Sequence, residues 1–455
     1  MKTATKTKFK QTEIGKSPES GMAGEWRQAR LAEICEHSAF GPRFSGELYA
    51  LDGNVATLRT TDISEDGRIE YATMPLARLD LSKFQQHLLH EDDLVVTRTG
   101  RVGTSAVFDG FRLPVLAGAF LIRFRLNREL AEPHFYRYYF NSPEGRALIT
   151  SVATGSVQQN LNITSLHGLV IPVPPLREQR AIAHILGTLD DKIELNHQMN
   201  KTIEAIGQAI FKHWFVDFEF PNEEREPYKS SGGEMVYNEE LEKEIPRGWT
   251  ITSLDQLHGK EDNCVITGPF GSNLHASDYR ETGTPLILVK HVKAGHITGM
   301  DMPLVGSHKF PEMHRYLLGT GDIVFTRVGV VGESAYIRKR NESWMISGQM
   351  LRVRANRNRI NPRYLAQVFQ QKAFKNQVSN CAVGSTRPSL NTKLLLSFRF
   401  VLPQLTLQNN FSELLEGADA HIENNLNEVD TLSSIRDSLV PKLMSGKIRV
   451  PLEIR

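Results

Sequence analysis

Cysteine is scarce in this sequence. The chain of 455 residues contains three cysteines, Cys35, Cys264 and Cys381, which are far apart and form no Cys-x-x-Cys pair. An odd and scattered set argues against a disulfide framework and against a structural zinc site. We therefore expect a protein of the reducing cytoplasm.

Long hydrophobic runs are also missing. No uncharged apolar segment reaches the roughly 18 residues that a membrane-spanning helix needs. The lysines that follow Met1 lead into no apolar stretch of the kind found in secretion signals. We expect a chain that neither spans a membrane nor is secreted.

A surplus of one charge is absent as well. Lysine and arginine number 54 against 52 acidic residues, which gives a formal net charge of +2. Hydrophobic residues make up 40% and charged residues 23%, as in an ordinary folded protein. The near balance neither requires nor excludes nucleic acid, because binding depends on local clusters of charge. The length predicts two or three domains.

Catalytic and metal-binding motifs are lacking too. Asn361-Pro-Arg-Tyr364 is similar to the Asn-Pro-Pro-Tyr motif of adenine methyltransferases, but its second proline is missing and no glycine-rich cofactor loop accompanies it. We interpret it as a turn before a helix. The segment that ends at Gly15-Lys-Ser17 lacks the first glycine of a phosphate-binding loop, and no His-Glu-x-x-His set is present. We predict no catalytic residue, no metal ligand and no cofactor on this chain.

The sequence does contain an internal duplication. The segment DLVVTRTGRVGTSA, from Asp93 to Ala106, returns as DIVFTRVGVVGESA from Asp322 to Ala335. The separation of Asp93 and Asp322 is 229 residues, and the same offset relates Gly155-Ser156 to Gly384-Ser385 and Leu161-Asn162 to Leu390-Asn391. A period of this length indicates a duplicated domain and excludes a solenoid.

Each copy combines a strand-rich region with a long helical region. Short β-type runs such as Asp93 to Thr97 are bounded by turn residues. The fold class that we predict is α+β: two strand-rich α/β domains separated by two long antiparallel coiled-coil helices, in a pseudo-two-fold repeat. The expected parts are an N-terminal tail (1–22), a first globular domain (23–173), a first helical region (174–219), an acidic linker (220–244), a second globular domain (245–402), a second helical region (403–446) and a C-terminal tail (447–455).

The helical regions carry narrow apolar stripes, which favour helix pairing. The first stripe is Ile182, Ile185, Leu189, Ile193, Asn196, Met199, Ile203, Ile206 and Ile210, and the second is Phe411, Leu414, Ala418, Ile422, Asn425, Leu432, Ile435, Leu439 and Leu443. A helix from Leu176 to Phe215 would be about 60 Å long at about 1.5 Å per residue. Asn196 and Asn425 coincide at the repeat offset. Either both fix the register of the helix pair from within its seam, or both are exposed.

An antiparallel pair of such helices would hold the two globular domains apart like the ends of a dumbbell. Equivalent faces of B-DNA recur about every 34 Å, the separation at which dimeric proteins read paired half-sites. Two related but non-identical domains would then read an asymmetric, split DNA sequence. Two independent domains on unpaired helices are the alternative.

Several segments carry a family resemblance in their order, spacing and duplication. They are the entries at Trp26 and at Ile245-Pro-Arg-Gly-Trp249, Gly268-Pro-Phe-Gly-Ser272 with Tyr279, the paired segments 153–162 and 383–391, and Pro174-Pro-Leu-Arg-Glu-Gln-Arg-Ala-Ile182. Over nearly its whole length the chain resembles the specificity subunits of type I restriction-modification systems. It departs from them in a longer first entry and in Leu405-Thr-Leu-Gln408, which replaces the Arg-Glu-Gln signature.

The resemblance implies a recognition subunit without chemistry of its own. Its partners would be double-stranded DNA, two N6-adenine methyltransferase subunits on the helical regions, and two ATP-driven restriction subunits. S-adenosylmethionine, ATP and Mg²⁺ would then bind to those partner subunits. A stand-alone DNA-binding regulator with a coiled-coil spacer is the alternative function.

The duplicated loop that follows Gly155 and Gly384 is the leading candidate for base contacts. Gln158, Gln159 and Asn160 in the first copy correspond to Arg387, Pro388 and Ser389 in the second, and Ser385 belongs to the same loop. Amide side chains suit adenine edges and arginine suits guanine, so the two domains would prefer different bases. The alternative is that these residues cap a turn.

A second set of candidates lies outside this loop. Arg98 and Arg327 are repeated within a glycine-flanked turn, where they would either contact phosphate or form a structural ion pair. Arg43, Lys290 and His291 lie in stretches that differ between the copies, and are either DNA contacts or solvated surface. The bases that are read do not follow from the sequence.

Overall fold

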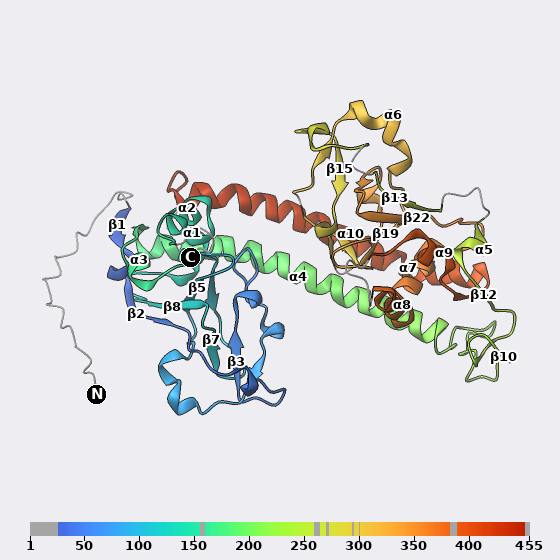
Figure 1. The fold of residues 1–455 in the computed structure, drawn as a ribbon, viewed down its shortest axis with the longest axis horizontal. Helices are drawn as coiled ribbons and strands as arrows, with labels where there is room; N and C mark the ends of the chain where they lie inside the picture. Colours follow the sequence, from blue (N-terminus) through green and yellow to red (C-terminus); the bar gives the residue numbers. More distant parts are fainter. Residues whose placement is uncertain are drawn as a thin grey trace, which may run out of the picture. The chain divides into compact units, whose positions relative to one another are not determined.

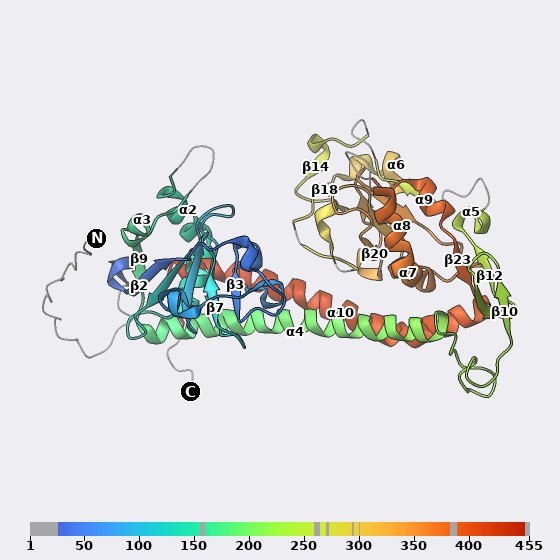
Figure 2. The same cartoon turned by 60° about the horizontal axis from the view of Figure 1, so that its bottom comes forward.

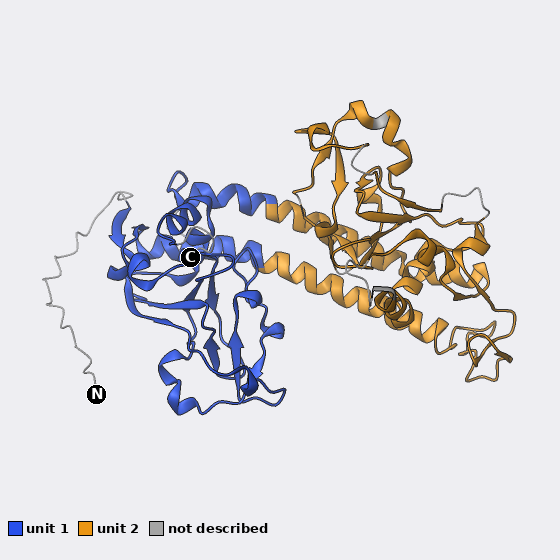
Figure 3. Cartoon of the chain, viewed as in Figure 1, with its two compact units in different colours: residues 1–190, 434–455 blue, residues 191–433 orange. Residues whose placement is uncertain are grey.

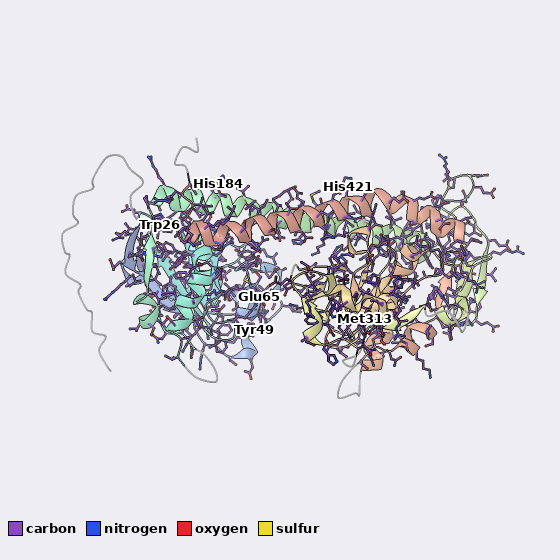
Figure 4. All side chains as sticks on the ribbon, turned by 90° about the horizontal axis from the view of Figure 1, so that it is seen from above. Trp26, Tyr49, Glu65, His184, Met313 and His421 are labelled. Carbon is purple, nitrogen blue, oxygen red and sulfur yellow. The ribbon has the colours of Figure 1, made fainter. Side chains whose placement is uncertain are left out.

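The structure is a computed structural model that describes residues 26–154, 160–258, 264–269, 273–293, 295–299, 301–382 and 389–450. The chain divides into two compact units, residues 1–190 with 434–455 and residues 191–433 (Figure 3). Each unit contains one strand-rich domain and part of each of two long helices (Figure 1). The units cut across the domain boundaries expected from the sequence, because each long helix takes part in both.

The first domain, which belongs to unit 1, is built on two sheets. One has the order β2-β8-β5-β6 with antiparallel neighbours throughout, and the other has the order β4-β3-β7 with β3 and β7 parallel. The elements are β1 (Arg27–Arg30), β2 (Cys35–Phe40), β3 (Val55–Leu58), β4 (Leu76–Ala77), β5 (Asp93–Thr97), β6 (Ser105–Phe108), β7 (Val115–Ala117), β8 (Leu121–Leu126), α1 (Pro133–Asn141), α2 (Pro143–Ser151), α3 (Ile163–His167) and β9 (Val170–Val173).

The second domain, in unit 2, repeats this plan. The sheet β13-β22-β19-β20 is antiparallel throughout, and in the sheet β14-β18-β15-β21 the strands β15 and β21 are parallel. The elements are β12 (Thr250–Thr252), α5 (Leu254–Leu257), β13 (Val265–Thr267), β14 (Tyr279–Arg280), β15 (Thr284–Ile287), β16 (Val292–Lys293), β17 (His296–Ile297), β18 (Leu304–Val305), α6 (Phe310–Met313), β19 (Ile323–Thr326), β20 (Ser334–Tyr336), β21 (Met345–Ile346), β22 (Met350–Val353), α7 (Pro362–Gln370), α8 (Lys372–Ala382), α9 (Thr392–Ser397) and β23 (Phe400–Leu402). The α+β class and the duplication are confirmed.

The two ends of each domain pair with one another. β1 runs antiparallel to β9 in the first domain, and β12 runs antiparallel to β23 in the second. The chain therefore leaves each domain beside the point where it entered, directly before a long helix.

The two long helices are α4 (Leu176–Phe215) and α10 (Leu405–Met444). The first has the bounds that its apolar pattern predicted. Gln179, in the first turn of α4, ties the start of this helix to the first domain. Its Nε2 donates to the Pro174 carbonyl at 2.8 Å, and its Oε1 accepts from the Glu132 amide at 2.8 Å. Gln408, at the repeat offset, makes the same two bonds with Pro403 and Asn361. No helix in the described ranges has an apolar stretch that could cross a bilayer.

α4 and α10 lie side by side and antiparallel in both units (Figure 2). In unit 2, Phe211 contacts Phe411 with ring centroids 5.8 Å apart, and Asn196 bonds to Glu428. In unit 1, Ile182 and Leu443 share one core. Helix pairing, expected from the apolar stripes, is therefore present in each unit.

The apolar stripes were predicted one position away from the true seam at several points. Met199, Ile206, Leu414 and Ile435 were expected in the seam but are exposed. Buried residues next to three of them take their place: Asn200, Gly207 and Leu415. The helical period of about 3.6 residues drifts relative to a strict heptad, so a stripe read at threes and fours moves off the contact line.

Asn196 and Asn425, which coincide at the repeat offset, each form a hydrogen bond across the helix pair. Asn196 is completely buried, and its Nδ2 donates to Glu428 Oε2 at 2.9 Å. The partly buried Asn425 donates from Nδ2 to Asn200 Oδ1 at 2.8 Å. Of the two alternatives for this pair, the placement favours the seam, and a role in register stays a prediction.

The acidic segment 220–244 suits either a solvated linker or a hairpin, and the structure shows a hairpin. Its strands are β10 (Met235–Asn238) and β11 (Lys243–Pro246), the second of which ends just beyond the segment. Phe220 is buried and stacks on Trp249 at 5.2 Å and on Tyr228 at 4.5 Å. Its glutamates face solvent, while Phe220 and Tyr228 join the core of unit 2.

Candidate nucleic-acid interface

The repeated glycine-flanked segment forms a strand, a tight turn and a second strand in each domain. Thr97 at the end of β5 donates its hydroxyl to the Arg101 carbonyl, and Thr326 at the end of β19 donates to the Val330 carbonyl. Gly103 and Gly332 have φ angles of +85° and +86°, which favour glycine. The turn thus has one geometry in both domains and places Arg98 and Arg327 directly after a central strand.

The main chain of each arginine anchors the end of the neighbouring candidate loop. Arg98 donates its amide to the Phe120 carbonyl at 2.8 Å, and its carbonyl accepts from the Leu161 amide at 3.2 Å. Arg327 makes the corresponding bonds with Gln349 and Leu390, both at 2.9 Å. The two candidate regions therefore come together in each domain.

The Arg98 side chain is held in place on two sides. Its Nε donates to Asn160 Oδ1 at 2.7 Å, and its guanidinium lies over the Phe40 ring at 4.7 Å. Within the described residues the terminal nitrogens have no hydrogen-bond partner, so they are free to donate to an acceptor such as a phosphate or guanine. Asn160 braces Arg98, and Arg98 forms no ion pair among the described residues.

The residues that follow the loops cap short helices. Asn162 Oδ1 accepts from the Ser165 amide at 2.8 Å and starts α3, and Asn391 Oδ1 accepts from the Leu394 amide at 2.9 Å and starts α9. An asparagine at this position stabilises a helix start. Gln158, Gln159, Ser385 and Arg387 lie outside the described residues.

The weaker candidates differ in exposure. Arg43 is exposed in the segment between β2 and β3. Lys290 is half exposed and forms an ion pair with Asp301. The His291 side chain is only 2% exposed: its Nδ1 accepts from the Leu288 amide at 3.0 Å, and its Nε2 lies 3.2 Å from Asp301 Oδ1. Burial, ahead of the neighbouring charges, lowers the pKa of His291. His291 therefore stabilises a turn in the structure.

The motif that is similar to a methyltransferase signature is structural. Asn361 Oδ1 accepts from the Arg363 amide at 2.8 Å and starts α7. Tyr364 is buried, and its hydroxyl donates to the Val401 carbonyl at 2.6 Å. The interpretation as a turn before a helix is correct. The described residues also contain no group of three or more His, Cys, Asp or Glu side chains placed to hold a metal ion.

Sequence reasoning missed two groups of residues. The ring of Phe40, directly before Gly41-Pro42, lies under the Arg98 guanidinium. This contact could have been predicted only from the pairing of β2 with β8. Asp190 was not among the candidates, yet it is buried and surrounded by arginines. The repeat offset takes Asp190 to Asp419, and this coincidence is the signal that could have found it.

Two copies of one strand-rich domain, each followed by a long helix, define a protein built on an internal duplication. The sequence matches the family described as the type I restriction modification DNA specificity domain over residues 23–205 and 309–430, together more than half of the chain. The chain belongs to this family.

Relatives of known function agree with this assignment. The MjaIX specificity subunit of Methanocaldococcus jannaschii is 23% identical over 98% of this chain and 97% of its own length. The EcoKI specificity subunit of Escherichia coli is 22% identical over 88% of this chain and 84% of its own length. Both are specificity subunits of type I restriction enzymes, so the prediction of a non-catalytic subunit is confirmed.

A solved structure supports the fold. The S subunit of the type I restriction-modification system of M. genitalium has a TM-score of 0.53 and is 18% identical, covering 92% of this chain and 96% of that chain. The chain is a specificity subunit of a type I restriction-modification system.

Proposed function

We propose that this subunit recognises an asymmetric, bipartite DNA site, with one half-site for each strand-rich domain. The observation that carries the proposal is the shared turn. In both domains the arginine after the central strand anchors the end of a loop, and the loops differ in sequence between the copies. One scaffold that presents two different loops suits two different half-sites.

Within each half-site we assign different tasks to the candidate residues. Arg98 and Arg327 contact phosphate, which sets orientation without reading sequence. Gln158, Gln159, Ser385 and Arg387 reach base edges in the major groove. Asn160 orients Arg98 through their 2.7 Å bond. Arg43 and Lys290 add contacts at the edges of the two domains.

The helices carry the partner subunits in this proposal. Three exposed apolar residues of α4, Leu195, Met199 and Ile206, share one helix face, with Met199 41% and Ile206 55% exposed. An uncovered apolar face on a paired helix suits a partner helix. We assign this face to one methyltransferase subunit. The second helical region would bind a second copy of that methyltransferase subunit. The DNA is then held so that each methyltransferase can flip an adenine out of its half-site.

Two restriction subunits complete the proposed complex. S-adenosylmethionine belongs to the methyltransferase subunits, and ATP and Mg²⁺ belong to the restriction subunits. The small net charge of +2 fits a chain whose grip on DNA is shared with its partners.

The decisive experiment is methylome sequencing of cells that carry the complete system, followed by a footprint of the purified methylase. The expected result is adenine methylation in two defined blocks separated by a spacer of indifferent sequence. A single continuous block would contradict the bipartite site. Tight, sequence-specific binding by the isolated chain in a gel shift would instead support the stand-alone regulator.

The partner surface has its own test. Met199→Glu combined with Ile206→Glu is expected to abolish copurification with the methyltransferase subunit, because two charges would be buried in an apolar contact. Gln198→Glu, at an exposed position beside this face, is the matched control. Retained assembly of the double variant would place the partner elsewhere.

A further inference from the structure

One carboxylate joins four segments of unit 1. The Asp190 side chain on α4 is 9% exposed. Its Oδ2 accepts from Arg137 Nη2 and from the Tyr138 hydroxyl, both at 2.6 Å, and both residues belong to α1. Its Oδ1 accepts from Arg436 Nη1 of α10 at 2.9 Å and from Arg68 Nη2 at 3.2 Å. We call Asp190 and these four partners the first anchor.

The first anchor is ionised and well compensated. Burial by itself raises the pKa of Asp190, but the Arg137 charge and the hydrogen bonds from Tyr138 and Arg436 outweigh it, so the pKa lies below its ordinary range. The pKa of Arg436 is raised: burial alone would lower it, and the bond to Asp190 outweighs that effect. A buried charge with this many partners is costly to disturb, because removing one group leaves the others unpaired.

Asp419, which lies at the repeat offset from Asp190, has the same task in unit 2. Its Oδ2 accepts from Arg363 Nε of α7 at 2.8 Å, and its Oδ1 accepts from Arg338 Nη2 at 3.3 Å. Glu204 of α4 lies 3.0 Å from the ring of His296, and that ring lies 3.2 Å from Arg338 Nη1. Farther along α10, Glu423 accepts from the Arg340 amide at 2.7 Å, and Asp430 pairs with the Arg340 side chain.

We call this second group the second anchor. Its members are Asp419, Glu423 and Asp430 of α10, Glu204 of α4, and Arg338, Arg340, Arg363 and His296 of the second domain.

The carboxylate is repeated, but its partners are not. The residue equivalent to Arg137 is Ala366, and the residue equivalent to Arg363 is His134. Arg363 is the second residue of α7 and Arg137 the fifth of α1, so the two arginines share a helix face although they occupy different positions. The two copies therefore reach one contact, from domain to helix carboxylate, with different residues.

In each anchor the other helix of the pair also takes part, which is α10 in unit 1 and α4 in unit 2. The two contribute side chains of opposite charge. In unit 1 it supplies Arg436 to a carboxylate. In unit 2 the residue equivalent to Arg436 is Gly207, and Glu204, one turn earlier, supplies a carboxylate to Arg338 and His296. The first domain thus reaches α10 through the shared Asp190 carboxylate and the 4.0 Å pair of Asp66 with Arg436, and the second domain bonds to both helices directly. The two copies do not share this chemistry.

We propose that Asp190 and Asp419 are positioning residues that fix the angle of each recognition domain on its helix pair and so set the spacing of half-sites that the assembled complex accepts. Charge-assisted hydrogen bonds are directional, unlike an apolar contact, and so suit this task. The inference rests on the proposed bipartite function.

The test uses the complete methylase with Asp190→Asn or Asp419→Asn in the specificity subunit. The substrates carry both half-sites and a series of spacers, each one base pair longer than the last. The wild-type complex is expected to methylate one spacer strongly. In the Asp190 variant the ratio of the preferred spacer to its neighbours is expected to fall by about tenfold or more, because small misplacements of a reacting group carry rate penalties of that size. The Asp419 variant is expected to lower this ratio less, because Glu204, Glu423 and Asp430 keep their partners. The bases required within each half-site stay unchanged.

Three further variants complete the experiment. Asp419→Leu with Arg363→Met replaces the charge pair by apolar groups, so this double variant is expected to keep its fold even where Asp419→Asn unfolds the chain. Its spacer selectivity is expected to relax as much as that of Asp419→Asn. Asp419→Glu keeps the charge and is expected to keep most of the selectivity. Glu416→Gln, exposed on the same helix, is the matched control with wild-type selectivity.

Two results would overturn the inference. Folded variants that keep the wild-type spacer profile would remove the positioning role and leave the bipartite function intact. A wild-type complex that methylates one undivided sequence would overturn the proposed function and this inference together.

Discussion

The two anchors solve one problem in two ways. In unit 1 a single carboxylate, Asp190, receives three arginines and a tyrosine. In unit 2 the charge pairs are distributed along α10 over Asp419, Glu423 and Asp430. Glu204 on α4 adds a further carboxylate. The Asp419 side chain is 23% exposed, more than twice the 9% of Asp190. A concentrated anchor fails when one residue is removed, whereas a distributed anchor loses one contact of several.

The same comparison separates what the duplication kept from what it replaced. The buried Asp93, paired with Arg125 of β8, recurs as Asp322 paired with Arg354, each with two short bonds. Inside the domains the repeat therefore conserves both partners. At the helices it conserves the carboxylate alone.

The largest expected effect is at the concentrated anchor. Asp190→Asn leaves Arg137, Arg436 and Arg68 without their shared counter-charge and is expected to lower the free energy of unfolding by about 4 kcal/mol. Urea denaturation followed by circular dichroism measures it. A loss equal to that of Asp419→Asn would contradict the distinction between the anchors.

The pH dependence of stability gives the next effect. Because the folded-state pKa of Asp190 lies below its ordinary value, its contribution is complete above the unfolded pKa of about 3.9 and disappears as the pH falls through the lowered value. The stability difference between wild type and Asp190→Asn should be constant near neutrality and shrink in acid. A difference that grows in acid would mean that the carboxylate is not stabilised in its charged form.

The repeated turns should respond alike. Gly103→Ala and Gly332→Ala each force a non-glycine residue into the left-handed region, and a new Cβ would lie 2.8 Å from Ile149 or 2.7 Å from Val378. Each substitution is expected to cost about 2 kcal/mol. Melting curves of the two variants test the equality. A marked difference would show that the duplicated turn has diverged in its energetics.

The smallest effect is expected at the distributed anchor. Asp419→Asn removes one partly exposed carboxylate while Glu204, Glu423 and Asp430 keep their partners. The expected loss is about 1.5 kcal/mol. The same urea titration measures it, with Glu416→Gln as the unaffected control. A loss as large as 4 kcal/mol would mean that Asp419 carries unit 2 alone.

The sequence predicted much of the fold and only part of the site. The duplication, the strand-rich domains and the bounds of α4 follow from local patterns, because strand and helix periodicity are properties of neighbouring residues. The exact seam did not follow: Met199 and Ile206 fit the stripe equally well, yet they lie outside it. His291 was a candidate for DNA contact, but the folded chain buries its side chain, which bonds to Asp301.

By itself the sequence determined the repeat, the class of fold and the family to which this specificity subunit belongs. Those features depend on residues that recur at fixed spacing along the chain. Only the tertiary structure decided that Arg98 lies on Phe40 and bonds to Asn160, and that Asp190 and Asp419 collect arginines from non-equivalent positions. Side chains with no fixed sequence relation meet only when sheets and helices have packed, because burial and charge pairing act through space.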